Sequence, residues 1–582
     1  MSKKKAQQAK RTGQSRKSSE PRFEWEPFLA RRRRWIWGGL AALLAVLYLS
    51  VASNQLGGNL GGDNAQYLFL AKALATGQGY VDLHLPDHPP HAKYPPFFPL
   101  LLAPLTLLGS HQLLASHLLI CALALLVPFS LAGWARGQGY SEAAALGVLL
   151  LVATVPRLYE FLLHILSDQP FLAFSYFALW RMAKANSQSK SLDLVLIIAA
   201  TLAALFTRTA GIALVAALAL EFLRRSDLRR LRSARIPWPV WFFVIVGLAF
   251  AAWSLRNRLV SGTSISYLNE FLLRDANYPQ FGYASPTELG QRFLERAFYY
   301  LPFMATQVSI GSIFFLGRES FSVDQLPWLI PVLIGLISRL RRSDRAAEWF
   351  FLLSAGLMCG WWYPDSRFIL PLLPLAGCYL LLGVRKIFGW ILTWIRPASA
   401  PAWSRYLAAA AGLLILLNQF RIVAGLVQSE HADRWEPAQA FAIANYGIWR
   451  EPVINWAKYE VVIEVESTIQ LLTRYIVICR IAAQRVPAGS VILSRKPTLT
   501  AWFADRPSIC YLFTTDTKEQ WKFLKKKQIE FVLVAGFTPE LSALFDDCPD
   551  CFQVEAGFAD GYPGLYRIVK SPAENDSRPA SQ

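Results

Sequence analysis

Residues 57–102 read GGNLGGDNAQYLFLAKALATGQGYVDLHLPDHPPHAKYPPFFPLLL and follow the first long apolar run of the chain. They combine an acidic residue in a glycine-rich turn with aromatic side chains, three histidines, two lysines and two Pro-Pro pairs. Glycines permit sharp turns and close backbone approach. The pattern of residues 63–75 predicts a short amphipathic helix with Asp63 and Tyr67 one turn apart on one face. We therefore expect a ligand-binding loop beside a membrane.

Four features of this loop resemble the first outer loop of GT-C-fold glycosyltransferases, in particular the bacterial relatives of protein mannosyltransferases and of the aminoarabinose transferase that modifies lipid A. They are Asp63 in its glycine-rich turn, Tyr67, Gly-Gln-Gly-Tyr at 77–80 and Lys-Tyr-Pro-Pro at 93–96. The resemblance implies a GT-C fold and a polyprenyl-phosphate-sugar donor. The sequence departs from many relatives at Asn64, where they carry a second acidic residue.

The same resemblance implies roles for individual residues. Asp63 would be the catalytic base and Lys93, directed by the Pro-Pro pair that follows it, would bind the donor phosphate. Tyr67 and Tyr94 would line the substrate site. The residues alone leave an alternative for Asp63, because Asp63-Asn64-Ala65-Gln66 has the spacing of a helix capping box in which the glutamine reaches back to the backbone.

The composition indicates a polytopic membrane protein, since 54% of the 582 residues are hydrophobic and only 17% are charged. We predict an all-α membrane domain of about 11–13 transmembrane helices followed by a small soluble α/β domain. Eleven apolar runs are long enough to be candidate spans: 35–52, 112–133, 142–156, 170–184, 192–207, 210–223, 238–254, 327–340, 347–363, 368–384 and 406–427. A twelfth run, 299–316, is interpreted as a surface-lying or re-entrant piece.

The basic residues cluster in alternate short loops, as the positive-inside rule requires, so the net charge of +19 does not indicate nucleic-acid binding. This distribution predicts a multi-pass membrane protein with a cytoplasmic N-terminus and an extracytoplasmic C-terminal domain, and the resemblance implies the bacterial inner (plasma) membrane. The expected parts are a disordered basic tail (1–30), a transmembrane domain (31–427) with outer loops 53–111 and 255–326, an α/β domain (428–570) and a disordered tail (571–582).

Within the C-terminal domain, the pattern predicts helices at 467–485 and 517–528 and strands at 491–494, 509–513, 531–534 and 565–569. No phosphate-binding loop or nucleophile motif is present in it, so we expect no catalytic residue there. Cys548-Pro-Asp-Cys551 stands without a second cysteine pair, which argues against zinc. A local disulfide is the expected state if the domain lies outside the cytoplasm.

Two further polar sites are predicted on the same outer side. Asp168 precedes the fourth apolar run and Arg367 precedes the tenth. The resemblance implies that Asp168 is a second catalytic acid and that Arg367 contacts the donor phosphate. The alternatives are a helix cap for Asp168 and a snorkelling interfacial arginine for Arg367. Arg256 and Asn257, at the outer end of the seventh run, are expected only to anchor the structure.

Three histidines, His84, His88 and His91, are spaced like weak candidate metal ligands. No cofactor is assigned, and a divalent cation is left open. The resemblance implies an inverting glycosyltransferase whose acceptor is a glycolipid, a polysaccharide or a protein. The alternative is a lipid or sugar transporter or flippase, but such proteins place ionisable residues near the bilayer midplane, whereas here the acids lie in predicted outer loops.

Overall fold

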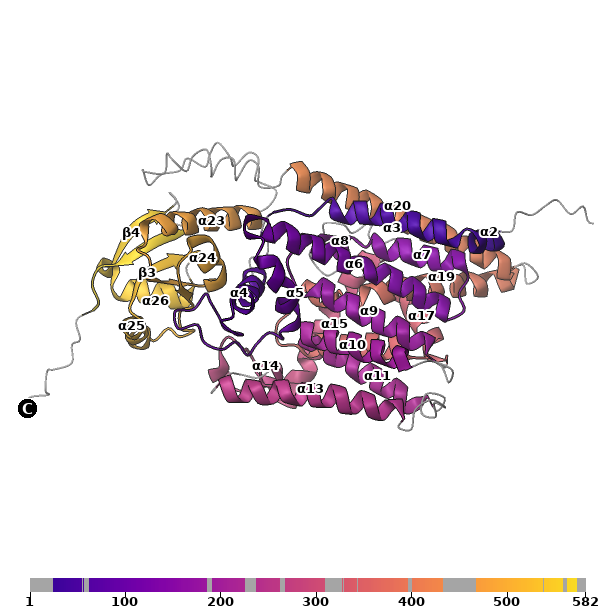
Figure 1. Ribbon diagram of the computed structural model, residues 1–582, viewed down its shortest axis with the longest axis horizontal. Coiled ribbons are helices and arrows are strands. Elements are labelled where there is room, and N and C mark those ends of the chain that lie inside the picture. Colours follow the sequence, from indigo (N-terminus) through magenta and orange to yellow (C-terminus); the bar gives the residue numbers. More distant parts are fainter. Residues whose placement is uncertain are drawn as a thin grey trace, which may run out of the picture.

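The computed structural model describes residues 25–572 except 55, 57–61, 186–190, 226–236, 262–266, 309–326, 328, 343, 396–399, 433–466, 537 and 558–562. Figure 1 shows a bundle of long helices with a small mixed α/β domain at one end. Most of the two predicted tails lies outside the described residues, but residues 25–31 form helix α2 (Trp25–Arg31). The apolar run 299–316 begins inside α15 (Pro286–Val308) and then leaves the described part of the chain.

Each of the eleven predicted apolar runs contains a helix. These helices are α3 (Arg33–Leu49), α6 (Gln112–Gly137), α7 (Glu142–Ala153), α9 (Asp168–Lys184), α10 (Ser191–Thr207), α11 (Ile212–Arg224), α13 (Trp238–Ser261), α17 (Ile330–Leu340), α18 (Ala346–Gly360), α19 (Leu373–Ile395) and α20 (Ala400–Ala432). Their mutual packing buries large apolar side chains. In α17 and α19 it brings the backbones together, because a Cβ on Gly335 would lie 1.9 Å from the Tyr379 carbonyl oxygen.

By length and composition, four helices among the described residues could cross a membrane: Gly109–Gly137, Trp238–Val260, Leu373–Ile395 and Trp403–Ala424. A fifth candidate is a pair, Glu142–Ala153 and Pro156–Leu163, that is bent by 55°. The other apolar helices are shorter, among them α10, α17 and α18. The count of 11–13 spans therefore stays a prediction.

Helices α9 and α10 run in opposite directions, so ion pairs between them mark two distinct ends. Asp168 at the start of α9 forms an ion pair with Arg208, which follows α10. At the opposite ends of the same two helices, Arg181 forms an ion pair with Asp193. The first of these ends carries the loop of residues 62–96, with α4 (Asp63–Ala75) leading through the loop to α5 (Phe97–Thr106). The residues predicted to be functional therefore gather at one end of the bundle.

The C-terminal domain contains a five-stranded sheet of order β2-β1-β3-β5-β4, in which β1 is parallel to β2 and β3 and the other pairings are antiparallel. Its strands are β1 (Val491–Ser494), β2 (Ser508–Ile509), β3 (Ile529–Val534), β4 (Phe552–Gly557) and β5 (Gly564–Ile568), and its helices are α23 (Ser467–Arg485), α24 (Pro497–Ala504), α25 (Thr517–Lys526) and α26 (Pro539–Asp547). Strand β2 is shorter than predicted, and α24, α26 and β4 were not predicted. The expected Cys548–Cys551 disulfide is present.

This domain is docked on the loop that carries Asp63, and Figure 1 shows α24 beside α4. The Ser508 amide donates to the His84 carbonyl oxygen (2.9 Å). The Thr498 hydroxyl donates to the Gly62 carbonyl oxygen (3.1 Å). The rings of Phe69 and Trp502 pack edge to face with centroids 5.6 Å apart. The sheet domain is therefore one wall of the region around Asp63.

Candidate active site

Asp63 is the first residue of α4, and its side chain is not a helix cap. The N-cap residue of α4 is Gly62, with φ +81°. No side chain makes a capping hydrogen bond at this end of the helix. The Gln66 side chain donates to Asp82 (2.7 Å) instead of reaching back to the start of the helix. The capping-box alternative is therefore wrong, because a glycine with positive φ already turns the chain into the helix and leaves the Asp63 carboxylate to other partners.

Both oxygens of the Asp63 carboxylate are held by distant residues. The Tyr94 hydroxyl donates to Oδ1 (2.8 Å) and the Arg367 guanidinium donates to Oδ2 (2.7 Å). Burial raises the pKa of Asp63, but the charge of Arg367 and these two hydrogen bonds outweigh it, so the pKa lies below the ordinary aspartate value. Asp63 is thus ionised at neutral pH.

Arg367 lies in the short 3-10 helix Ser366–Ile369, and it faces carboxylates instead of water. Besides Asp63 it forms an ion pair with Asp365 (3.0 Å), which also caps this helix by accepting from the Arg367 amide (2.9 Å). Burial lowers the pKa of Arg367, but the neighbouring carboxylates outweigh this and raise it. A snorkelling arginine would place its guanidinium in water, so that alternative is wrong for Arg367.

Asp168 has a different partner from Asp63. Ser167, not Asp168, is the N-cap of α9 and makes no side-chain cap bond. The buried Asp168 carboxylate forms an ion pair with Arg208, so the cap alternative is wrong here too. Ser167 shares a hydrogen bond with the Tyr67 hydroxyl (2.8 Å), and the Tyr67 ring lies 5.1 Å from that of Tyr94. Tyr67 and Tyr94 thus connect the two acidic sites.

Lys93 is placed differently from its neighbour Tyr94. Its ammonium pairs with Glu270 (3.2 Å) in α14 (Tyr267–Leu272), and 54% of its side chain is exposed. Pro95 and Pro96 lie between Lys93 and α5. Lys93 is therefore at the edge of the site, not in contact with Asp63.

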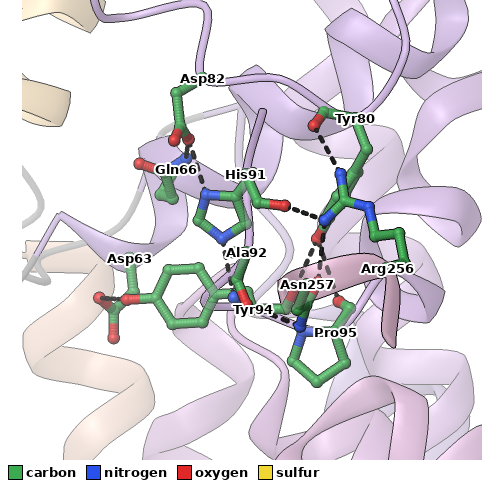
Figure 2. Close-up of polar contacts among 10 residues, drawn as sticks. All are labelled: Asp63, Gln66, Tyr80, Asp82, His91, Ala92, Tyr94, Pro95, Arg256 and Asn257. Carbon is green, nitrogen blue, oxygen red and sulfur yellow. Dashed lines mark hydrogen bonds and ion pairs between the residues drawn. The ribbon is translucent and has the colours of Figure 1, made fainter. Parts of the chain in front are cut away.

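The three histidines have separate environments. His91 pairs with Asp82 (2.8 Å) and accepts from the Tyr94 amide (2.7 Å), so it fixes the residue that holds Asp63, as Figure 2 shows. His84 is buried, which lowers its pKa to about 4. His88 lies in the left-handed region with φ +41°. Within the described residues, no three His, Cys, Asp or Glu side chains are arranged to hold a metal ion.

The end of α13 holds the loop by its backbone, as expected for Arg256 and Asn257. Arg256 donates to the carbonyl oxygens of Tyr80 and His91, and Asn257 donates to that of Ala92 (3.0 Å). Figure 2 shows these contacts on the side of His91 away from Asp82. They fix the backbone that leads to Tyr94, and the Tyr94 hydroxyl in turn fixes Asp63.

Asp63 opens onto a pocket of about 260 Å³ between the loop and the C-terminal domain. The loop contributes Gly62, Asp63, Gln66, His84 and Tyr94, and the C-terminal domain contributes Arg495, Lys496, Pro497 and Thr498. The pocket therefore offers an ionised carboxylate, a neutral imidazole and two basic side chains to a ligand. This arrangement suits proton abstraction from a hydroxyl group beside a negatively charged group.

Comparisons with known proteins concern the fold and the family likeness of the chain. Residues 87–254 match the family model described as dolichyl-phosphate-mannose-protein mannosyltransferase. Crystal structures of ArnT from Cupriavidus metallidurans are similar in the apo state (TM-score 0.52, 14% identity, 93% of this chain and 100% of that chain) and with undecaprenyl phosphate bound (TM-score 0.51, 14% identity, 92% and 98%). The fold is the GT-C fold. An Archaeoglobus fulgidus oligosaccharyltransferase structure, tethered with an acceptor peptide, gives a TM-score of 0.49 at 11% identity, over 87% of this chain and 69% of that one. No curated protein matches the sequence.

In the GT-C fold of this multi-pass membrane protein, two parts of the site were missed by sequence reasoning. Arg208 had a signal, because it is an arginine between two apolar runs on the side where the positive-inside rule predicts few. Arg495 and Lys496 had no such signal, since they come from a domain whose sequence carries no catalytic motif. Only the docking of α24 beside α4 brings them to Asp63.

Proposed function

We propose that the chain is a glycosyltransferase that moves a sugar from a polyprenyl-phosphate-linked donor to an acceptor hydroxyl at the outer face of the bacterial inner membrane. The observation that carries the proposal is the Asp63 carboxylate, held by Arg367 and Tyr94 at the wall of a pocket. The match of residues 87–254 to a mannosyltransferase family and the likeness to a protein that binds undecaprenyl phosphate support it.

The proposed reaction begins with Asp63 as general base. Each carboxylate oxygen has two lone pairs. The acceptor hydroxyl can therefore donate to Asp63 while Tyr94 and Arg367 keep their hydrogen bonds to the same carboxylate. The acceptor oxygen attacks the anomeric carbon of the donor, its proton passes to Asp63, and the bond from that carbon to the phosphate oxygen breaks. The lipid phosphate leaves from the opposite side, which inverts the configuration at the anomeric carbon.

The leaving phosphate gains charge during this step and needs a cation. Arg367 is proposed for this role, because it reaches Asp63 from the helical bundle, where a donor embedded in lipid would arrive. Lys93 is proposed to guide the phosphate at the edge of the site. Asp168 is proposed as a positioning residue, since it holds Arg208 beside Ser167 and Tyr67.

The outer location of the site is part of the proposal. A disulfide such as Cys548–Cys551 persists in oxidising compartments. The docked domain and Asp63 must lie on the same face of the membrane, and the basic clusters in alternate loops predict that this face is the outer one. A glycolipid, polysaccharide or protein acceptor is accessible there.

Transfer from a radiolabelled polyprenyl-phosphate-sugar in membranes tests the proposal. Because a positioned general base contributes about 10²–10⁴ in rate, Asp63→Asn should remove nearly all donor consumption while leaving donor binding intact. Lys93→Ala should instead raise the donor concentration needed for half-maximal rate. Asp87→Asn is the matched control, since its carboxylate is 78% exposed in the same loop. Movement of label across the membrane without hydrolysis or transfer would support the transporter alternative and contradict the proposal.

A further inference from the structure

The wall of the pocket opposite the loop is built by the connection between β1 and α24. Arg495 and Lys496 occupy this connection, and both line the pocket together with Asp63. They belong to the soluble domain, whereas Arg367 reaches Asp63 from the helical bundle. The Asp63 carboxylate thus has Arg367 on the side of the helical bundle and two cations on the side of the soluble domain.

The backbone of this connection is fixed by a buried hydroxyl cluster. The Tyr475 hydroxyl in α23 is hydrogen-bonded to Ser494 (2.7 Å) and Thr500 (2.6 Å), which are also bonded to each other (2.7 Å). The Lys496 amide donates to the Ser494 hydroxyl (3.1 Å). At the pocket, Thr498 binds the carbonyl oxygen of Gly62 (3.1 Å). Lys496 is therefore held in place from both sides, and the loop and the domain share one rigid contact beside Asp63.

The carboxylates near the two cations have other partners. The charge of Asp63 acts on Lys496, and Glu540, which accepts from the Tyr278 hydroxyl, lies near Arg495. Within the described residues, neither Arg495 nor Lys496 forms an ion pair with a carboxylate, and the Arg495 guanidinium lies 4.6 Å from the centre of the Phe513 ring. The nearby carboxylate of Asp63 already pairs with Arg367. Lys496 is half-buried, and burial lowers its pKa. A half-buried ammonium that shares its nearby carboxylate with a guanidinium would be stabilised by a further anion from a ligand.

A third group in the pocket, the imidazole of His84, has an unpaired buried nitrogen. Only 6% of His84 is exposed, and its Nδ1 atom is buried with no hydrogen-bond partner among the described residues. Buried polar groups in proteins normally have a partner, so an unpaired one at a pocket wall points to a ligand. Because burial lowers the pKa of His84 to about 4, its ring is neutral and can hydrogen-bond to a sugar or acceptor hydroxyl.

We propose that Arg495 and Lys496 bind an oxyanion, a phosphate or carboxylate group, of the acceptor and so place the acceptor's hydroxyl against Asp63. This inference rests on the proposed function and adds the class of acceptor, one that carries a negative charge near the hydroxyl that receives the sugar. The donor phosphate is the other source of the same chemistry. The position of the two cations on the soluble domain favours the acceptor, because the donor's lipid chain keeps its phosphate at the bundle.

Differential labelling of the full-length protein in detergent tests this site without measuring transfer. Lys496 is labelled with an amine-reactive reagent, with and without inorganic phosphate, and quantified by mass spectrometry. Phosphate should protect Lys496 but not Lys522, an exposed lysine of the same domain. In Arg495→Gln, half-protection should need about tenfold more phosphate, since a charge-assisted contact is lost, whereas Lys522→Gln should leave it unchanged. Equal labelling of Lys496 with and without phosphate would overturn the proposal.

A second probe, polyprenyl monophosphate, separates acceptor from donor. If saturating lipid phosphate leaves Lys496 open to labelling and added inorganic phosphate then protects it, the two cations belong to the acceptor. If lipid phosphate alone protects Lys496 and inorganic phosphate adds nothing, the assignment to the acceptor is wrong. Both outcomes are independent of catalysis, so they differ from a failure of the proposed function, which would appear as undiminished transfer by Asp63→Asn.

Discussion

At the scale of the residue, the character of Asp63 is set by its contacts and not by its place at a helix end. A carboxylate that caps a helix gives its lone pairs to backbone amides, whereas Asp63 gives them to Tyr94 and Arg367. These contacts make Asp63 a weaker base, because they lower its pKa. The gain is a fixed position, which contributes more to transfer than a small rise in basicity.

The dependence of activity on pH should report this balance. With Asp63 as the proposed base, transfer requires its ionised form and is lost as pH falls through its pKa. The wild type should therefore keep its activity down to about pH 4, the ordinary aspartate value. In Arg367→Gln the largest lowering influence is removed and burial raises the pKa. The acidic limb of the profile should then move above pH 4.

Arg274→Gln is the control for this change, because that arginine is half-exposed and pairs with Glu288 away from the site. A profile for Arg367→Gln that fell at the same pH as the wild type would show that Asp63 is not the titrating group. The absolute rate is not the readout here, since Arg367 also faces the proposed donor phosphate.

At the scale of the element, α4 and α24 meet at one point where no side chain fits. A Cβ added to Gly62 would lie 2.3 Å from the Thr498 hydroxyl oxygen, and the φ of +81° is unfavourable for any other residue. The left-handed conformation alone costs about 1–2 kcal/mol. This glycine therefore sets the distance between the loop and the soluble domain.

Gly62→Ala should loosen this contact and lower the melting temperature of the protein. In a Thr498→Ala background the clash is relieved but the backbone strain remains, so the same change should cost less there. Gly77→Ala is the matched control: its φ of +73° is also positive, but nothing lies within 4 Å of an added Cβ. Equal losses in all three comparisons would show that only backbone strain matters at Gly62.

The sequence predicted most of these elements because their signals are local. Helix α4, helix α23 and strand β1 have the predicted bounds, since glycine turns, a serine start and an apolar run mark them. Helix α24 was missed because it is short and begins at Pro497 directly after a strand. Strand β4 was missed because its burial is irregular, with exposed residues in its centre.

At the scale of the whole molecule, the fold could be predicted but the pocket could not. Apolar runs and the alternation of charge indicate a bundle and its direction. The contacts that close the site join Gly62 to Thr498 and Asp63 to Arg367, which lie 436 and 304 positions apart. No local pattern records such pairings, so the part of the site made by the soluble domain becomes visible only in three dimensions.

Membrane orientation can be tested with reporter fusions. A reporter that is active only outside the cytoplasm should give a signal when fused after residue 430 and none when fused near residue 230, because the arginines at 224–235 mark an inner loop. A cytoplasmic result at residue 430 would contradict the proposed outer location of Asp63 and of the domain that covers it.

The Cys548–Cys551 pair gives an independent test of compartment. Alkylation of the protein from intact cells should leave both cysteines unmodified before reduction and label both after it. Cys510, half-buried in the same domain and not part of a disulfide, serves as the internal comparison. Labelling of Cys548 and Cys551 without reduction would place the domain in a reducing compartment.

The contact between Gly62 and Thr498 also has a consequence for biosynthesis. Ribosomes add about 5–20 residues per second, so the loop emerges roughly 20–90 seconds before Thr498, its partner 436 positions later. Until translation is nearly finished, the pocket at Asp63 lacks the side that the C-terminal domain provides. A growing chain should therefore be catalytically silent, and a truncated product released by a stalled ribosome should consume no activated sugar.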